Sequence, residues 1–325
     1  MRPKIILHIG AAKTGSSAIQ AFLRRNAQAF AECGFIVPDR YLGLSANITG
    51  EHVWAIQERI NAADKSGLVA RLEQAAELAG EGKTLLISAE NLSNLGNHQY
   101  LAEALKRSDA RVILYIRRQD ELLTSAWQQW HSKVESDFNA WLLKGLKTYG
   151  HWDRLTGDWE NAVGPGRLVV RIFERDAMVD HDLLKDFVAA IGLGDDKAAF
   201  EYDLGVVNPS FSDVITPLVA GNTRLFEDAN DNHFFNFLLK IDQEMFSGAK
   251  KVSLISRASR ESICAYYQEI NARVCNKYFP GRPQLFANID HSKYNYLEGE
   301  ALLKLQLQFL LELTFKSHQY LEKRK

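Results

Sequence analysis

The stretch that decides the fold reads Lys4-Ile5-Ile6-Leu7-His8-Ile9-Gly10-Ala11-Ala12-Lys13-Thr14-Gly15-Ser16-Ser17. Residues 5–9 form an apolar run, as expected for a strand that is buried on both faces of a parallel sheet. A turn bounded by two glycines follows, and apolar residues over 19–30 recur at helical spacing, which predicts one helix that Gly34 ends. Strand, glycine-bounded turn and helix together point free backbone N–H groups at an anion. The sequence therefore predicts an anion site at this turn.

Further strand-like segments recur along the first two thirds of the chain. They lie at 35–38, 84–88, 111–116 and 168–173. Helix-like sequence follows each of them, and the first is followed by two helical stretches near 53–62 and 68–79. Strands that alternate with helices favour a parallel sheet with right-handed crossovers.

The C-terminal third has a different character. Strand signals end after about residue 213, and helical periodicity runs through 234–245, 256–278 and 297–321. The predicted fold class is therefore α/β: a P-loop-like parallel sheet of four to five strands flanked by helices, with a mainly helical C-terminal part. We expect one α/β domain over 1–290 and a helical extension over 291–325 that packs on it.

Composition narrows the class of protein. The chain has 325 residues, of which 46% are hydrophobic and 24% charged, and this balance predicts a packed core. A formal net charge of -1 argues against a surface built for nucleic acid, so any site for an anion must be local. Three cysteines without metal-ligand spacing favour a reducing compartment. The apolar run near the N-terminus is too short for a signal peptide or a membrane span, so we expect a cytoplasmic protein.

Two common nucleotide-binding loops do not match the glycine-bounded turn. A Walker A loop places its lysine directly after the final glycine, whereas Lys13 comes two positions before Gly15. A dinucleotide fingerprint needs the pattern Gly-x-Gly-x-x-Gly, which is missing here. The turn nevertheless combines two glycines, a lysine and two serines at a helix start, and each of these can serve an anion.

The segment from Ile6 to Ser17 resembles the 5′-phosphosulfate loop of sulfotransferases that use 3′-phosphoadenosine 5′-phosphosulfate (PAPS). It is most similar to bacterial members related to carbohydrate sulfotransferases, which more often have two threonines at positions 16 and 17. The resemblance extends over residues 4 to about 286. It implies that PAPS is the cosubstrate and that the loop residues bind it: Gly10, Ala12, Lys13, Thr14, Gly15, Ser16 and Ser17.

A second segment supports the same family. Arg117 follows the strand-like segment 111–116, and Ser125 lies eight positions further on. In the family, an arginine and a serine at this spacing bind the 3′-phosphate of the nucleotide. A guanidinium can fork onto two phosphate oxygens, and a hydroxyl supplies another donor. The resemblance therefore implies that Arg117 and Ser125 hold the 3′-phosphate, although the family often has proline where this chain has Gln119.

Sulfuryl transfer also needs a base for the acceptor hydroxyl and a cation for the leaving group. Lys13 is the candidate cation. Glu90 follows the strand-like segment 84–88, and ligands of open parallel sheets gather at the carboxyl ends of strands. Carbohydrate sulfotransferases commonly use a glutamate as the base, which makes Glu90 the first candidate. His52, on the loop after the second strand, is the second candidate, and the sequence leaves the choice open.

The resemblance implies a carbohydrate or glycolipid hydroxyl as the acceptor, and no metal is required. Two rival functions stay open: a P-loop-type kinase or related nucleotide-phosphate enzyme, and a non-catalytic relative that binds a nucleotide or a glycan. The apolar C-terminal helix at 297–321 is most simply a packed helix. A subunit contact and a peripheral contact with a membrane surface are its alternatives.

Overall fold

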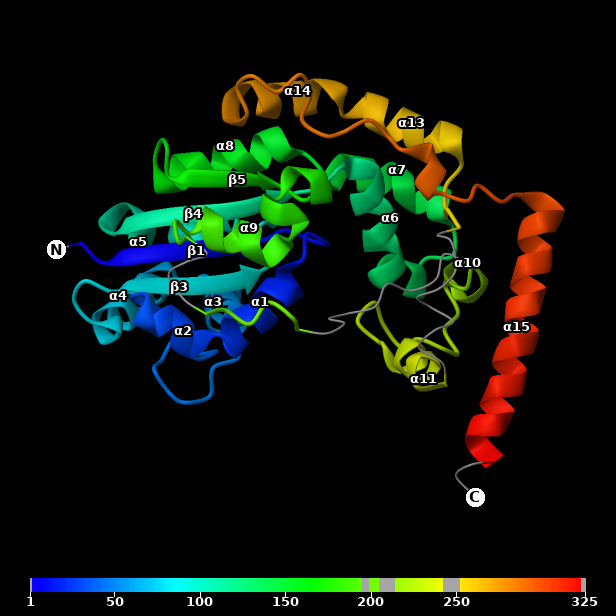
Figure 1. Ribbon diagram of the computed structural model, residues 1–325, viewed down its shortest axis with the longest axis horizontal. Coiled ribbons are helices and arrows are strands. Elements are labelled where there is room, and N and C mark those ends of the chain that lie inside the picture. Colours follow the sequence, from blue (N-terminus) through cyan, green and yellow to red (C-terminus); the bar gives the residue numbers. More distant parts are fainter. Residues whose placement is uncertain (1, 195–198, 205–213, 242–251, 323–325) are drawn as a thin grey trace. The chain divides into compact units, whose positions relative to one another are not determined.

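The computed structural model describes residues 2–194, 199–204, 214–241 and 252–322. Five parallel strands form one sheet in the order β2-β3-β1-β4-β5. Figure 1 shows β3, β1, β4 and β5 following one another in this order. The strands are β1 (Lys4–Gly10), β2 (Phe35–Ile36), β3 (Thr84–Glu90), β4 (Asp109–Ile116) and β5 (Leu168–Ile172). All five strand predictions are confirmed, and with them the α/β fold class.

Helices cover both faces of this sheet, because parallel strands must be joined by crossovers. Helices α1 (Ser16–Arg25) and α9 (Leu183–Ala190) pack together on one face, where Phe22 and Phe187 join Ile6 of β1 in a buried cluster. Three helices pack side by side on the other face: α4 (Lys65–Ala79), α5 (His98–Arg107) and α8 (Trp152–Val163). Helix α3 (Val53–Asn61) packs against α4 and β3. The two helices expected near 53–62 and 68–79 are thus confirmed.

The helix predicted over 19–30 is interrupted. The structure has α1 and a second short helix, α2 (Ala27–Glu32), with a break at Asn26. The Asn26 amide bonds the carbonyl of Phe22 and both backbone groups of Glu201, and it is buried there. This side chain competes with regular helical bonding, and its distant partner could not be read from local periodicity.

Internal contacts divide the chain into two compact units. The first comprises Met1–Arg118, His151–Val207 and Glu269–Phe286, and it holds the sheet. The second comprises Gln119–Gly150, Asn208–Gln268 and Ala287–Lys325. The described part of the second unit is mainly helical, with α6 (Gln119–Gln129), α7 (Phe138–Thr148), α10 (Thr216–Val219), α11 (His233–Ile241), α13 (Arg257–Tyr266) and α15 (Gly299–Glu322). The domain division expected at residue 290 stays a prediction.

The second unit has a core of its own. Phe226, Phe235 and Leu238 are buried together, and Phe309 and Leu313 of α15 pack against them.

The three helical regions predicted after residue 213 are confirmed where they are described, whereas 242–245 lies outside the described residues. The region 256–278 is not one helix. It divides at Tyr267 into α13 and α14 (Gln268–Tyr278), and the Tyr267 hydroxyl donates to the carbonyls of Leu146 and Tyr149.

Candidate functional site

The glycine-bounded turn follows β1 directly at the carboxyl edge of the sheet. Lys13 and Gly15 both take left-handed backbone torsions, with φ of 59° and 83°. The buried Thr14 hydroxyl closes the turn by donating to the carbonyl of Ala11 at 2.8 Å. A Cβ at Gly15 would lie 2.4 Å from a methyl carbon of Leu183, so both the torsion and the packing require glycine.

The turn leads straight into α1, whose first backbone N–H groups have no partner within the helix. Ser16 begins this helix, and its hydroxyl is buried without a hydrogen-bond partner among the described residues. A Cβ at Gly10 would lie only 2.5 Å from that hydroxyl oxygen. Gly10 therefore lets the Ser16 hydroxyl lie close against the end of β1, and this buried, unsatisfied donor needs a partner. These donors fit a phosphate or sulfate group.

Arg117 is held against the back of the same turn. Its guanidinium donates to the carbonyl of Lys13 at 3.0 Å and lies 5.5 Å from the centre of the Phe173 ring. The indole of Trp152 in turn donates to the carbonyl of Arg117 at 3.0 Å. Arg117 thereby connects the end of β4 to the turn that follows β1.

Lys13 follows β1 and Glu90 ends β3, and the charge of each shifts the pKa of the other. Gly10 and Glu90 are partners in the parallel register, so the turn and the carboxylate share one edge. Burial lowers the pKa of Lys13, nearby Arg117 lowers it further, and Glu90 opposes the shift. Burial raises the pKa of Glu90, Lys13 opposes that shift, and Glu51 adds to it. The Glu90 carboxyl group thus binds a proton more readily than an exposed glutamate does.

His52 occupies a structural position at the edge of β3. Its imidazole is fully buried, and this burial lowers the pKa of His52. Nε2 lies 3.0 Å from the carbonyl of Pro38 and therefore carries the proton, and Nδ1 accepts the N–H of Ser88 at 3.0 Å. The backbone N–H of His52 also donates to the carbonyl of Ser88. His52 thus pairs with the end of β3, and both of its ring nitrogens contact backbone groups.

A second buried histidine lies within the sheet. Nδ1 of His8 is 2.9 Å from the hydroxyl of Ser88, and Nε2 has no hydrogen-bond partner in the part of the chain that is described. The ring packs edge-on against Tyr115 and Phe187. Burial lowers the pKa of His8 to about 3, so the ring is neutral at physiological pH.

The structure brings Lys13, Arg117 and Glu90 together within the first unit. Ser125 lies half-buried in the middle of α6 and belongs to the second unit, so its pairing with Arg117 stays a prediction. Sequence reasoning missed Phe173 and Glu51. Phe173 directly follows β5, and the rule that ligands gather at carboxyl ends of strands could have found it. Glu51 has no comparable local signal.

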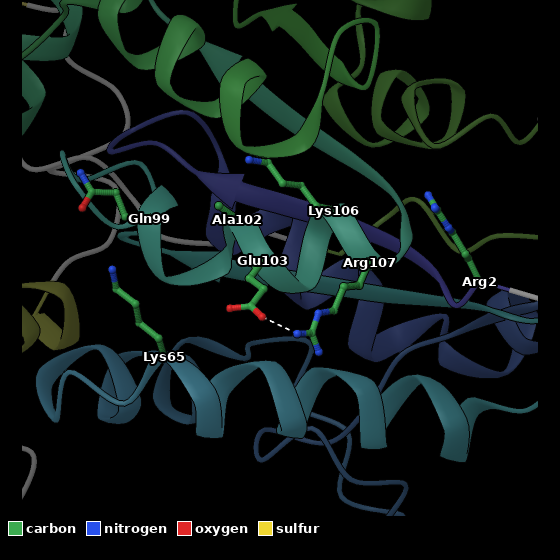
Figure 2. Close-up of a pocket in the computed structure, with 7 residues that line it drawn as sticks. All are labelled: Arg2, Lys65, Gln99, Ala102, Glu103, Lys106 and Arg107. Atoms are coloured by element: carbon green, nitrogen blue, oxygen red, sulfur yellow. Dashed lines mark hydrogen bonds and ion pairs between the residues drawn. The ribbon is translucent and has the colours of Figure 1, made fainter.

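A separate cavity of about 670 Å³ lies between α4 and α5 (Figure 2). It is lined by Arg2, Lys65, Gln99, Ala102, Glu103, Lys106 and Arg107. Arg107 pairs with Glu103 and Glu73, which reduces the positive charge of this groove. None of the candidate site residues lines it.

The described residues hold neither a metal cluster nor a membrane-spanning helix. No three histidine, cysteine or acidic side chains among them are placed to share a metal ion. None of the described helices combines the length and the apolar character that crossing a bilayer requires.

Comparisons with known proteins are remote. No protein-family model matches the chain. An uncharacterized protein of Archaeoglobus fulgidus is 26% identical over 208 residues, which are 62% of this chain and 55% of that protein. The chain thus spans about half the length of this relative. A crystal structure of a sulfotransferase from Alicyclobacillus acidocaldarius aligns over 64% of this chain and 87% of its own, with 16% identity and a TM-score of 0.40. Likenesses of this size do not assign the chain to a family.

Proposed function

We propose that this protein is a sulfotransferase that moves a sulfuryl group from PAPS to a carbohydrate hydroxyl. One observation carries the proposal: a glycine-bounded anion loop, a partly buried lysine and a carboxylate of raised pKa meet at one edge of a parallel sheet. Phosphate binding alone would need the first two. Transfer of a group to a hydroxyl needs, in addition to the loop and the lysine, a neighbouring carboxylate that can accept a proton.

The anion loop supports the donor half of this proposal. The unpartnered Ser16 hydroxyl fits the phosphosulfate end of PAPS, and the first N–H groups of α1 supply further donors. Lys13 places a positive charge where negative charge grows as the nucleotide leaves. Arg117, already fixed against the loop, is the proposed ligand of the 3′-phosphate, with Ser125 as its partner.

Glu90 supports the acceptor half. PAPS, when bound, supplies the sulfuryl group. The Glu90 carboxylate takes the proton of the acceptor hydroxyl as that oxygen bonds to sulfur, and the nucleotide keeps the electron pair of the bond that breaks. Burial raises the pKa of Glu90, and Lys13 opposes this rise, so Lys13 favours the ionised carboxylate that accepts the proton. His52 has a structural position, so we carry Glu90 forward as the base.

Calorimetry with two nucleotides tests the donor site. We expect adenosine 3′,5′-bisphosphate to bind at least about tenfold more tightly than AMP, because the 3′-phosphate adds a charge-assisted bidentate contact. The difference is expected to disappear in Arg117→Gln and to persist in Lys106→Gln, which removes one cation from the separate cavity. Equal affinities of the unaltered protein for both nucleotides would contradict the proposed role of Arg117.

Transfer assays separate the rival functions. The proposal predicts movement of radioactive sulfate from PAPS to an oligosaccharide acceptor without added metal. Turnover of ATP with magnesium, and no use of PAPS, would favour a P-loop-type kinase. Nucleotide binding without transfer to any hydroxyl acceptor would favour the non-catalytic alternative.

A further inference from the structure

The loop after β2 is held in one conformation by a single carboxylate. Asp39 accepts the backbone N–H groups of Tyr41, Gly43 and Ser45. Burial opposes the ionisation of Asp39, but these hydrogen bonds together lower its pKa below the ordinary value. Leu42, which follows Tyr41, is buried and has a left-handed φ of 61°. This backbone torsion is costly for a leucine. A strained loop that its surroundings hold this firmly commonly serves a ligand.

Helix α4 fixes the same loop from the other side. The guanidinium of Arg71 donates two hydrogen bonds to the carbonyl of Tyr41. The backbone of Tyr41 is therefore bonded at both its N–H and its carbonyl group, although its side chain is 60% exposed. The backbone that carries this exposed aromatic ring is thus fixed.

A second aromatic ring and a cation complete this surface. Trp54, in the first turn of α3, is 59% exposed. The guanidinium carbon of Arg40 lies 5.6 Å from the centre of the Tyr41 ring and 5.4 Å from that of Trp54. Arg40 Nε is buried and has no hydrogen-bond partner among the described residues. We call Arg40, Tyr41 and Trp54 the aromatic platform.

The chain connects this platform to the candidate base. Pro38 and Ser88 are joined through His52, so the loop starts beside the end of β3. Glu51 is close enough to Glu90 to raise its pKa, and Trp54 follows Glu51 by three positions at the beginning of α3. The platform therefore belongs to the same edge of the first unit as the proposed chemistry.

We propose that the aromatic platform binds the acceptor, and that the acceptor is an acidic carbohydrate. This inference rests on the proposed function for the role of acceptor. Aromatic faces stack on the apolar C–H face of a pyranose ring while their polar tips reach its hydroxyls. Arg40 supplies a planar cation for an anionic substituent, either a carboxylate or a sulfate ester already present.

Tryptophan fluorescence and calorimetry test the platform without any donor nucleotide. The other five tryptophans are described residues that are buried or half-buried, so quenching by a ligand reports mainly on Trp54. Three tetrasaccharides serve as probes: alternating glucuronate and N-acetylglucosamine, neutral N-acetylglucosamine, and the neutral chain carrying 6-O-sulfates. We expect both acidic probes, or one of them, to bind at least about tenfold more tightly than the neutral one. The preferred acidic probe identifies the anionic substituent.

Matched variants locate the binding. Trp54→Ala is expected to weaken the acidic probe at least about tenfold, whereas Leu78→Ala, which also shortens an exposed apolar side chain, leaves the affinity unchanged. Arg40→Gln is expected to remove the preference for acidic probes, whereas Lys106→Gln, in the cavity of Figure 2, preserves it. All four positions are exposed or half-buried, and circular dichroism checks that each variant folds.

Three results would overturn the inference: no binding of any probe, equal binding in Trp54→Ala, or equal losses in Arg40→Gln and Lys106→Gln. The last result would mean diffuse attraction to basic side chains. Because no donor is present, these outcomes are independent of the nucleotide tests. Failure to bind adenosine 3′,5′-bisphosphate with intact oligosaccharide binding would refute the proposed function and preserve the platform as a glycan site.

Discussion

Substitution of Gly10 by alanine probes the close contact between the end of β1 and the first residue of α1. The new Cβ would lie 2.5 Å from the Ser16 hydroxyl oxygen and 3.1 Å from the Cα of Glu90. The serine side chain can rotate away, but the β3 backbone cannot do so without disturbing the sheet. Gly10 has no left-handed torsion, so the cost comes from packing alone, and overpacking of this kind typically costs about 1–3 kcal/mol.

Gly10→Ala is expected to affect nucleotide binding more clearly than it affects the free energy of unfolding. When Ser16 rotates, its hydroxyl moves away from the anion-binding turn. We expect the affinity for adenosine 3′,5′-bisphosphate to fall about tenfold, which corresponds to the loss of one hydrogen bond to a charged group. Gly157→Ala is the matched control. Gly157 lies inside α8 with nothing within 4 Å of the added Cβ, so this variant is expected to gain about 0.5–1 kcal/mol without loss of affinity.

Urea unfolding and calorimetry measure both effects. The reasoning fails if Gly10→Ala retains both the free energy of unfolding and the nucleotide affinity of the unaltered protein. It also fails if Gly157→Ala loses as much affinity as Gly10→Ala, because the effect would then not be local to the loop.

Three further predictions concern charge and protonation. Lys13→Ala is expected to fold normally and to lose turnover, since the lysine is placed to stabilise the leaving group; an unchanged kcat would exclude it from the chemistry. Glu90→Gln is expected to lower kcat about 10²–10⁴-fold while nucleotide binding survives. His52→Gln is expected mainly to lower thermal stability. A large loss of kcat in His52→Gln together with a nearly normal kcat in Glu90→Gln would make His52 the base. Below pH 6.5 the unfolded chain binds a proton on His8 that the folded chain, with its pKa of about 3, does not bind. Folding stability therefore falls as pH drops, by about 2 kcal/mol at pH 5 from this residue, and urea unfolding of His8→Gln is expected to lack that share; equal losses in both proteins would show that His8 is not the titrating group.

Local chemistry determined what could be read before the structure was known. The apolar run 5–9, the two glycines of the turn and the helical spacing that follows all act within a few residues of each other. The five strands and most helices were readable for the same reason, because burial on a sheet face or a helix stripe imposes a short repeat. Parallel topology then placed the ends of β1, β3 and β4 at one edge, so Lys13, Glu90 and Arg117 could be grouped from sequence alone.

The tertiary structure decided what depends on distant partners. Asn26 interrupts a helix because of Glu201, which is far along the chain. His52 looks like a free base in the sequence, yet the backbone of Pro38 and Ser88 occupies both of its ring nitrogens. The aromatic platform likewise exists because Asp39 and Arg71 fold one loop against two helices. Such bonds join residues that share no repeat or spacing, and only the folded chain brings their donors and acceptors within reach.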